Sequence, residues 1–305
     1  MIGLSTSWLT ERAEITGRKV IEEIVALGFR AVELEYRIDV NLFREMRPLI
    51  LKEALKIVSI HNFFPTPDST PTSKASGDLF LLSSPDQEER NRSITKTLQT
   101  IEWAHDLGAR VVVLHLGRVD MDPEYDRIYT LSRHGTLDSV EGQRFLVEKQ
   151  RERLRKRQPY LEATFRSLDH LVEEAEKRGI LLGVENRYHY HEIPDFAEIG
   201  LILEHFSGGS LRYWHDVGHA HVQEKLGFMR PGDLLRSYKS LLIGIHLHDV
   251  NGLDDHWSPG SGEIDFPALR EHLKSAQIKI LEVHKKSDRK ELLSGRNMLE
   301  RIGLV

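Results

Sequence analysis

The segment Leu181-Leu182-Gly183-Val184-Glu185-Asn186 is a short apolar run that ends in a carboxylate. Near-continuous apolar runs of this length are typical of parallel strands that are covered on both faces of their sheet. A carboxylate at the end of such a strand needs an ion partner or a metal, because a lone buried charge is too costly. The segment therefore predicts a buried parallel strand with a functional group at its carboxyl end.

Seven further apolar runs occur along the chain, and helix-like segments alternate with them. The eight predicted strands are Ile2–Ser5, Ala31–Leu34, Ile57–His61, Val111–Leu116, Ile180–Glu185, Leu211–Asp216, Leu242–His248 and Ile278–Val283. The predicted helical segments are Ala13–Leu27, Asn41–Leu55, Asp86–Leu107, Ser139–Arg178, Phe196–Phe206, Pro231–Tyr238, Phe266–Ala276 and Asp288–Ile302. Such alternation indicates parallel βαβ units, and eight units predict a closed (β/α)8 TIM barrel. An open doubly wound sheet is the alternative, but no glycine-rich phosphate loop follows the first strand.

The length of the chain fits one barrel with insertions. A (β/α)8 barrel takes about 250 residues, so we expect a single domain over residues 1–305. Long loops are expected at about 62–85, a stretch rich in proline, and at about 117–138. Both follow predicted strands, so they would lie on the carboxyl-terminal face, where long loops often serve as lids or binding loops.

The composition excludes several classes of protein. The formal net charge of −5 provides no overall basic field for nucleic acid or an anionic membrane. The sequence has no cysteine, so it holds neither a disulfide nor a thiolate metal site. With no signal-peptide pattern and no apolar run of roughly 18 residues, we expect a cytoplasmic protein. The basic run Lys149–Arg157 is interpreted as a solvated helix face, and a phosphate or nucleic-acid patch is the alternative.

Histidines and carboxylates gather where the predicted strands end. Of the 16 histidines, 11 lie at a strand end or in the loop just after it: His61, His115, His189, His191, His215, His219, His221, His246, His248, His256 and His284. Clustering of this kind at one face points to metal binding or acid–base chemistry.

Four residues from four successive predicted strands form the strongest candidate metal site. Glu185, Asp216 and Glu282 are carboxylates in otherwise apolar strands, and His246 lies on the strand between the last two. Two Glu, one Asp and one His make an oxygen-rich set that favours Mn, Mg or Co and also accepts Zn. His219 lies three residues after Asp216, so its side chain can return to the same candidate metal site and contact either a metal or a substrate.

Several segments, in their order and spacing, resemble the xylose isomerase-like TIM barrel superfamily of sugar phosphate isomerases/epimerases and endonuclease IV-type enzymes. The resemblance covers nearly the whole chain and rests on Gly28–Leu34, Gly108–His115, Gly183–Asn186, Asp216–His219, Gly244–Asp249, Pro259–Phe266 and Ile280–Glu282. It implies the same barrel fold that the strand pattern predicts.

Likeness to the ketose 3-epimerase branch implies a function and roles for these residues. Glu185, Asp216, His246 and Glu282 would bind one divalent metal (Mn, Co, Mg or Zn), and the two glutamates would act as acid and base through an enediolate. We therefore interpret the chain as a metal-dependent isomerase or epimerase of a sugar or sugar phosphate, without membrane or nucleic-acid partners and able to form a homo-oligomer. The expected substrate-binding residues are His61, His115, His219, Arg187, His248 and Trp257.

Two alternatives are also compatible with the sequence. Likeness to the endonuclease IV branch (AP endonuclease family 2) implies a metal-dependent phosphoesterase with further metal ligands, for which His219, Asp254, His256 and His115 are the candidates. The further histidine of that branch, expected near Ser84-Pro85, is a serine here. The second alternative is a sugar-binding barrel without catalysis.

Overall fold

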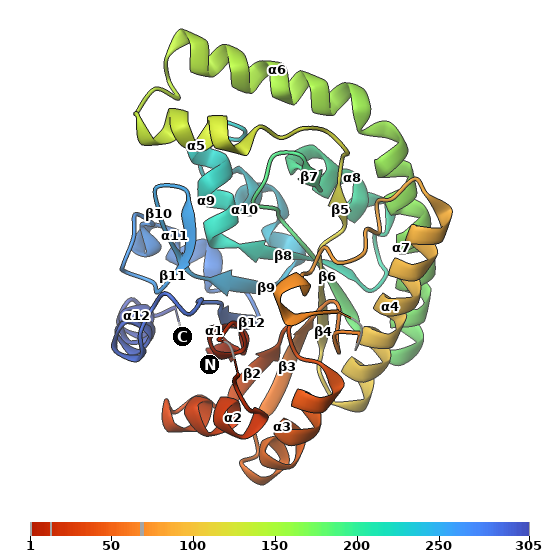
Figure 1. The fold of residues 1–305 in the computed structure, drawn as a ribbon, viewed down its shortest axis with the longest axis vertical. Helices are drawn as coiled ribbons and strands as arrows, with labels where there is room; N and C mark the ends of the chain where they lie inside the picture. The colour runs from red at the N-terminus through yellow and green to blue at the C-terminus, as the bar shows by residue number, and fades with distance from the viewer. Residues whose placement is uncertain (1, 13, 68–69, 305) are drawn as a thin grey trace.

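Eight parallel strands close into a barrel, with helices packed around it (Figure 1). The computed structural model describes residues 2–12, 14–67 and 70–304. The barrel strands are β1 (Gly3–Ser5), β2 (Ala31–Leu34), β3 (Lys56–His61), β4 (Val111–Leu114), β6 (Leu181–Glu185), β8 (Leu211–Asp216), β9 (Leu242–Leu247) and β12 (Ile278–Leu281). They follow one another around the ring in chain order, and β12 closes it against β1. The predicted (β/α)8 barrel is confirmed, and β2 and β8 have the predicted bounds.

Helices cover the outside of the ring. They are α2 (Gly17–Ala26), α3 (Val40–Lys52), α4 (Gln87–Asp106), α7 (Gln158–Arg178), α8 (Phe196–His205), α9 (Val217–Lys225), α10 (Asp233–Tyr238), α11 (Phe266–Leu273) and α12 (Arg289–Arg301). An aspartate side chain accepts a backbone N–H at the start of several of them, including Asp39, Asp86, Asp195 and Asp288. Such caps satisfy N–H groups that a helix start leaves unpaired, so they fix where each helix begins.

Three segments differ from the sequence-based expectation. The predicted helix Ser139–Arg178 is two helices, α6 (Val140–Lys156) and α7, because Pro159 enters at the first turn of the second. The predicted irregular loop at about 117–138 contains a short strand, β5 (Gly117–Arg118), and a helix, α5 (Tyr125–Arg133). Helix α9 was not predicted, because six of its nine residues are buried and the segment has no apolar stripe beside a polar one.

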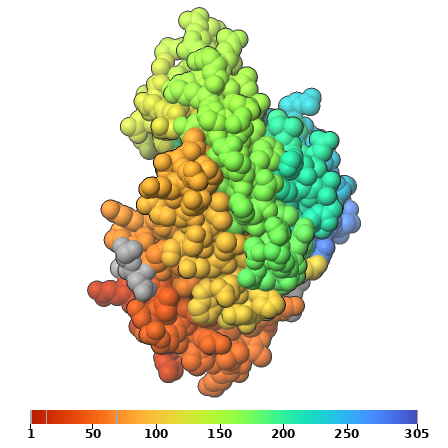
Figure 2. Space-filling model, turned by 90° about the vertical axis from the view of Figure 1, so that its right-hand side faces the viewer, coloured from red at the N-terminus to blue at the C-terminus, as the bar shows by residue number. Residues whose placement is uncertain are grey.

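Additions to the barrel rise above the carboxyl ends of the strands. β5 pairs with β7 (Glu192–Ile193), and β10 (Asp249–Asn251) pairs with β11 (Asp254–Trp257), both antiparallel. The expected loop at about 62–85 is irregular apart from one short 3-10 turn, with residues 68 and 69 outside the described part. Helices α5 and α6 project beyond the ring in Figure 1, and Figure 2 shows the projection at the top of the molecule.

A large tryptophan fills the barrel beneath its mouth. Residues that alternate along each strand point either to the helices or into the barrel. Val111, Val113 and Ile243 point inward and pack around Trp214, which is fully buried. Gly244 on the neighbouring strand leaves room for the ring of Trp214. This apolar layer is the floor on which the polar residues of the mouth lie.

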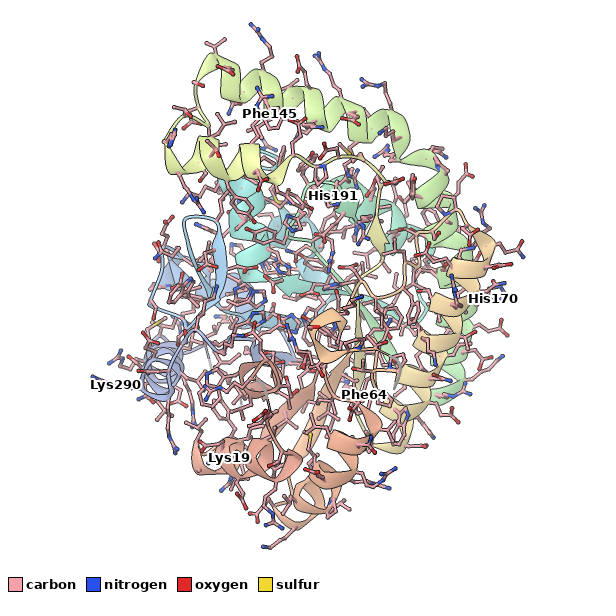
Figure 3. All side chains as sticks on the ribbon, viewed as in Figure 1. Lys19, Phe64, Phe145, His170, His191 and Lys290 are labelled. Carbon is pink, nitrogen blue, oxygen red and sulfur yellow. The ribbon has the colours of Figure 1, made fainter. Side chains whose placement is uncertain are left out.

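The surface follows the usual division between polar and apolar side chains. Phe64 and Phe145 are buried, whereas Lys19 and Lys290 are exposed at the outer edge (Figure 3). Within the described residues, none of the helices combines the length and apolar composition needed to cross a bilayer.

The fit of Trp214 gives a stability test. A Cβ atom at Gly244 would overlap the Trp214 ring, whereas one at Gly183 would lie 3.2 Å from its nearest atoms. We expect Gly244→Ala to lower the free energy of unfolding by about 2 kcal/mol or more, since overpacking a rigid core is costly. Gly183→Ala, on the other strand beside the same ring, should cost less. Urea-induced unfolding measures both, and a Gly244→Ala protein as stable as the wild type would contradict this packing.

Candidate metal centre

Four side chains meet inside the mouth of the barrel. Glu185 ends β6, Asp216 ends β8, His246 lies on β9, and Glu282 directly follows β12. One ligand atom from each lies within 4.8 Å of the others, and each residue is at most 5% exposed. The structure thus brings together the four residues that the sequence singled out, in a group that could hold one metal ion.

The ring of His246 shows that this group needs a positive charge. Its Nε2 lies 3.1 and 3.2 Å from the two carboxylate oxygens of Glu33, so the Nε2 proton is donated there. Its Nδ1 lies 2.7 Å from Glu185 Oε1 and 2.9 Å from Glu282 Oε2. A nitrogen lone pair that faces two carboxylates in a buried site requires a cation between them, either a second proton or a metal ion.

Without a metal ion, shifts in the pKa of His246 and of Glu185 keep the charges of the group balanced. Burial opposes the imidazolium, but Glu282, Glu33 and Glu185 outweigh it and raise the pKa of His246 well above its usual value. Burial likewise opposes the carboxylate of Glu185, but His246 and His115 hold its pKa well below the usual range. A proton on His246 therefore supplies the charge when no metal is bound, and a metal ion must displace that proton.

Glu185 offers its second carboxylate oxygen to another group. His61 Nδ1 donates to the backbone carbonyl of Asn62 (2.9 Å), and His115 Nδ1 donates to Asp78 Oδ2 (3.1 Å). Both rings then direct Nε2 at Glu185 Oε2, from 3.5 Å for His61 and 2.9 Å for His115. The three ligand atoms lie within 4.8 Å of one another. This group also fits a cation, and Glu185 would bridge the two positions.

A third group contains Asp216, His219, His248 and His256, with ligand atoms within 4.8 Å. The backbone N–H of His256 donates to His248 Nδ1 (2.9 Å), so the proton of His248 is on Nε2 and is donated to Asp216 (2.9 Å). His248 therefore orients Asp216 and has no lone pair left for a metal. His219 Nδ1 donates to the backbone carbonyl of Asn186 (3.1 Å), which leaves its Nε2 free.

Asp255 rather than Asp254 lies beside these histidines. Asp255 Oδ1 is 3.0 Å from His256 Nδ1, and its Oδ2 is 3.7 Å from His219 Nε2. Asp254 has a 60% exposed side chain and accepts a hydrogen bond from the indole N–H of Trp257. Successive residues of β11 point to opposite sides, and the φ of 57° at His256 turns its ring back inward. The Asp-x-His spacing predicted Asp254 as a metal ligand, but the structure brings Asp255 to the group instead.

A cavity of about 830 Å³, the mouth cavity, lies beside these groups and is lined by one histidine of the second group, His115, and one of the third, His219. Three of the residues expected to bind substrate line it, namely His115, Arg187 and His219. His61 and His248 are buried in the groups described above, and the Trp257 ring lies under the ammonium of Lys286. The mouth cavity therefore gives a small molecule access to only part of the residue set predicted from the sequence.

Arg187 has a different environment from the one expected of a phosphate-binding residue. Its Nη2 lies 2.6 Å from Asp78 Oδ2 and 2.9 Å from Glu192 Oε1. Burial opposes the guanidinium charge, but Asp78 and Glu192 raise the pKa of Arg187 above its usual value. The charge of Arg187 is therefore already balanced inside the protein.

Besides Asp255, two further residues of the site were not predicted from the sequence. Glu33 interrupts the apolar run Ala31–Leu34, which is the same signal that identified Glu185 and Glu282. Asp78 lies in the long loop after β3, where no pattern marked it. Glu33 accepts from Ser59 Oγ (2.8 Å) as well as from His246, so it is held in place as a support for that ring.

Comparisons with known proteins place this geometry in a family. A sequence model described as xylose isomerase-like TIM barrel matches residues 21–302. An uncharacterised protein of Methanocaldococcus jannaschii is 32% identical over 120 residues, which are 37% of this chain and 39% of that protein. The match thus spans well under half of that relative.

Solved structures share the fold across almost the whole chain. A D-tagatose 3-epimerase-like protein has a TM-score of 0.65 and 22% identity, covering 99% of this chain and 96% of the other. D-psicose 3-epimerase from Clostridium cellulolyticum has a TM-score of 0.68 and 13% identity, covering 98% of each. At these identities the likeness establishes the barrel architecture.

The role of Glu33 can be tested by metal binding. We expect Glu33→Gln to weaken binding of Mn²⁺ or Zn²⁺ by about 10- to 100-fold, because the carboxylate that fixes the His246 tautomer is lost. Competition with a chromogenic chelator measures this without any activity assay. Glu35→Gln is the matched control, since Glu35 is equally buried but bonds Thr10 and Arg37. Wild-type affinity in Glu33→Gln would remove Glu33 from the site.

Proposed function

The chain belongs to the xylose isomerase-like TIM barrel family, and from this premise we propose that it is a divalent-metal-dependent isomerase or epimerase of a sugar or sugar phosphate. The observation that carries the proposal is the pair Glu185 and Glu282, whose oxygens approach the same nitrogen, His246 Nδ1. The names of the similar epimerase structures support the same reaction class. With no cysteine in the sequence, we also propose a cytoplasmic location.

The proposed chemistry moves a proton next to a carbonyl. A divalent metal bound by Glu185, Asp216, His246 and Glu282 would polarise the substrate carbonyl and so acidify the neighbouring C–H. One glutamate then takes that proton, and the other returns one to the opposite face for epimerisation or to the next carbon for isomerisation.

Both glutamates are ionised in the metal-free form, which is the state that the base needs, and the one that returns a proton must first take one up from solvent or substrate. Burial would raise the pKa of Glu282, but His246 and His256 lower it well below its usual value, as His246 and His115 do for Glu185. Both side chains are therefore ionised at neutral pH and able to accept a proton. Glu282 is the more accessible of the two, at 5% exposed against 0%.

The mouth cavity supports a polar, hydroxylated substrate. His219 presents a free Nε2, and Asp255 lies 3.7 Å from it, so both can bond substrate hydroxyls. Arg187 is already paired with two carboxylates and is a poor phosphate anchor. These contacts suit the hydroxyl groups of a sugar.

Exchange of the substrate C–H proton with solvent tests the reaction class. In D₂O, the Mn²⁺-loaded protein should replace the proton beside the carbonyl of one or more ketoses, as followed by proton NMR. Glu185→Gln and Glu282→Gln should each slow this exchange by at least about 100-fold while the circular dichroism spectrum stays unchanged. Glu263→Gln, an exposed carboxylate paired with Lys225, is the control and should keep the wild-type rate. Full exchange by Glu282→Gln would disprove its role.

A metal-dependent phosphoesterase of the endonuclease IV type is the second candidate. The second group, His61, His115 and Glu185, favours it, because a second cation close to the first can stabilise both the attacking and the leaving oxygen of a phosphodiester. In a sugar isomerase with one metal, this group would instead serve only to hold Glu185 in place.

Counting metal ions separates the two candidates. If the second group binds zinc, the wild type should hold at least two equivalents and His61→Ala one fewer, as measured by elemental analysis after dialysis. Nicking of DNA with an abasic site should then fall with the lost ion. If His61→Ala leaves both the zinc content and the nicking unchanged, the second group is not a metal site and the phosphoesterase candidate loses its support.

A further inference from the structure

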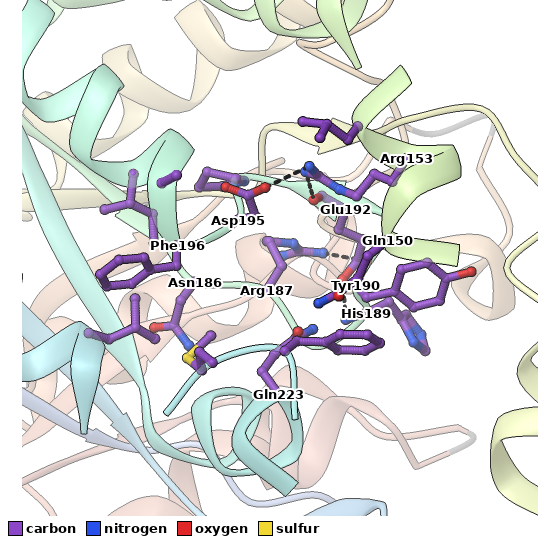
Figure 4. A pocket seen from close by; sticks show the side chains of 17 residues that line it. Gln150, Arg153, Asn186, Arg187, His189, Tyr190, Glu192, Asp195, Phe196 and Gln223 are labelled. Atoms are coloured by element: carbon purple, nitrogen blue, oxygen red, sulfur yellow. Dashed lines mark hydrogen bonds and ion pairs between the residues drawn. The ribbon is translucent and has the colours of Figure 1, made fainter. Parts of the chain in front are cut away.

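A second cavity, the side cavity, lies between α6, the segment after β6 and the start of α8 (Figure 4). Its volume is about 310 Å³, at the lower end of the range of roughly 300–1,000 Å³ for small-molecule pockets. Phe196, Phe228, Met229 and Leu234 supply apolar wall, and the polar side chains include Arg187. The side cavity is thus apolar on one side and polar on the other.

Unpaired hydrogen-bond donors border the side cavity. Arg187 is only 5% exposed, and its Nη2 is paired with Asp78 and Glu192. Its Nη1 and Nε are buried and have no hydrogen-bond partner among the described residues, nor does Nε of Arg153, which is 4% exposed. A buried donor without an acceptor destabilises the protein. These nitrogen atoms have almost no accessible surface, so an oxygen acceptor inside the cavity would satisfy them once the guanidinium shifts toward it.

The charges around the side cavity argue against an anionic occupant. Arg153 contacts Asp195 at 2.8 Å and Glu198 at 2.7 Å, and Arg157 lies 3.5 Å from Glu198. Of the charged side chains that line the side cavity, Arg153 and Arg187 are positive and Glu192 and Asp195 are negative, and each is in an ion pair. Because these charges balance and are already paired, the side cavity offers a phosphate or carboxylate ligand no spare positive charge.

We propose that the side cavity binds an uncharged, polyhydroxylated molecule of monosaccharide size. Its hydroxyl oxygens would accept from the unpaired N–H groups of Arg187 and Arg153, and its C–H face would pack on Phe196 and Phe228. The site differs from the mouth cavity and shares with it only a wall that includes Arg187, His189 and Glu192. The proposal needs neither a bound metal nor any catalytic turnover.

Short contacts connect this wall to the candidate metal centre. Arg187 Nη2 lies 2.6 Å from Asp78 Oδ2, which lies 3.1 Å from His115 Nδ1, and His115 Nε2 lies 2.9 Å from Glu185 Oε2. A ligand that draws Arg187 toward the side cavity would weaken its hold on Asp78. An occupant of the side cavity therefore has a direct route to the second group.

Methyl NMR of methionine can observe the site directly. The chain has five methionines, and Met229 lines the side cavity while Met46 and Met298 lie elsewhere in the fold. With ¹³C-methyl methionine labelling, D-glucose and D-fructose are the probes and inorganic phosphate is the anionic comparison. We expect either sugar to shift the Met229 signal saturably and leave Met46 and Met298 in place, and we expect phosphate to have no such effect. Met229→Leu assigns the signal.

A blocking variant completes the test. Ala197 is exposed on α8 at the rim of the side cavity, so Ala197→Trp should fill the opening and weaken the sugar-dependent shift at least about tenfold. Ala26→Trp, at an exposed position on α2, is the control and should behave like the wild type. The proposal is overturned if neither sugar moves Met229, if phosphate moves it more than the sugars do, or if Ala197→Trp keeps the wild-type response. Because the readout is binding alone, each outcome is independent of whether the protein interconverts sugars.

Discussion

A nitrogen lone pair facing carboxylate oxygens in a buried place is the constraint on which this barrel mouth depends. His246 Nδ1 is held toward Glu185 and Glu282 because Glu33 takes the proton on the other side of the ring. The negative side chains can remain close together only around a proton or a metal ion. Trp214 packs beneath this arrangement, fully buried and with its ring in edge contact with the imidazole of His246.

Much of this arrangement could be predicted from the sequence, because two simple signals point to it. Parallel strands covered on both faces appear as short apolar runs, so the barrel follows from their number and from the helices between them. A charged residue that interrupts such a run has few roles other than a functional one, and this identified Glu185, Asp216 and Glu282. Glu33 carries the same signal, and only its partner across the barrel shows that it supports His246.

The remaining features depend on contacts that spacing does not encode. Asp78 reaches His115 from an irregular loop, whose path is not set by any periodic pattern. Asp255 takes the position expected for Asp254 because the backbone at His256 is left-handed. No residue type in this segment predicts that conformation. The side cavity combines residues from α6 with residues of α8 to α10, segments that are distant in the chain.

The carboxylate of Asp216 has two roles. It lies among the candidate ligands and also accepts the backbone N–H of His219 at 2.6 Å, which makes it the cap of α9. A cation bound to this carboxylate would pull the oxygen, or its electron density, away from the N–H of His219. The hydrogen bond that closes the first turn of α9 would therefore change in strength. The amide hydrogens at the start of α9 should thus exchange with solvent at a rate that depends on whether a metal ion is bound in the barrel mouth, so local unfolding of the first turn of this helix reports on the state of the site.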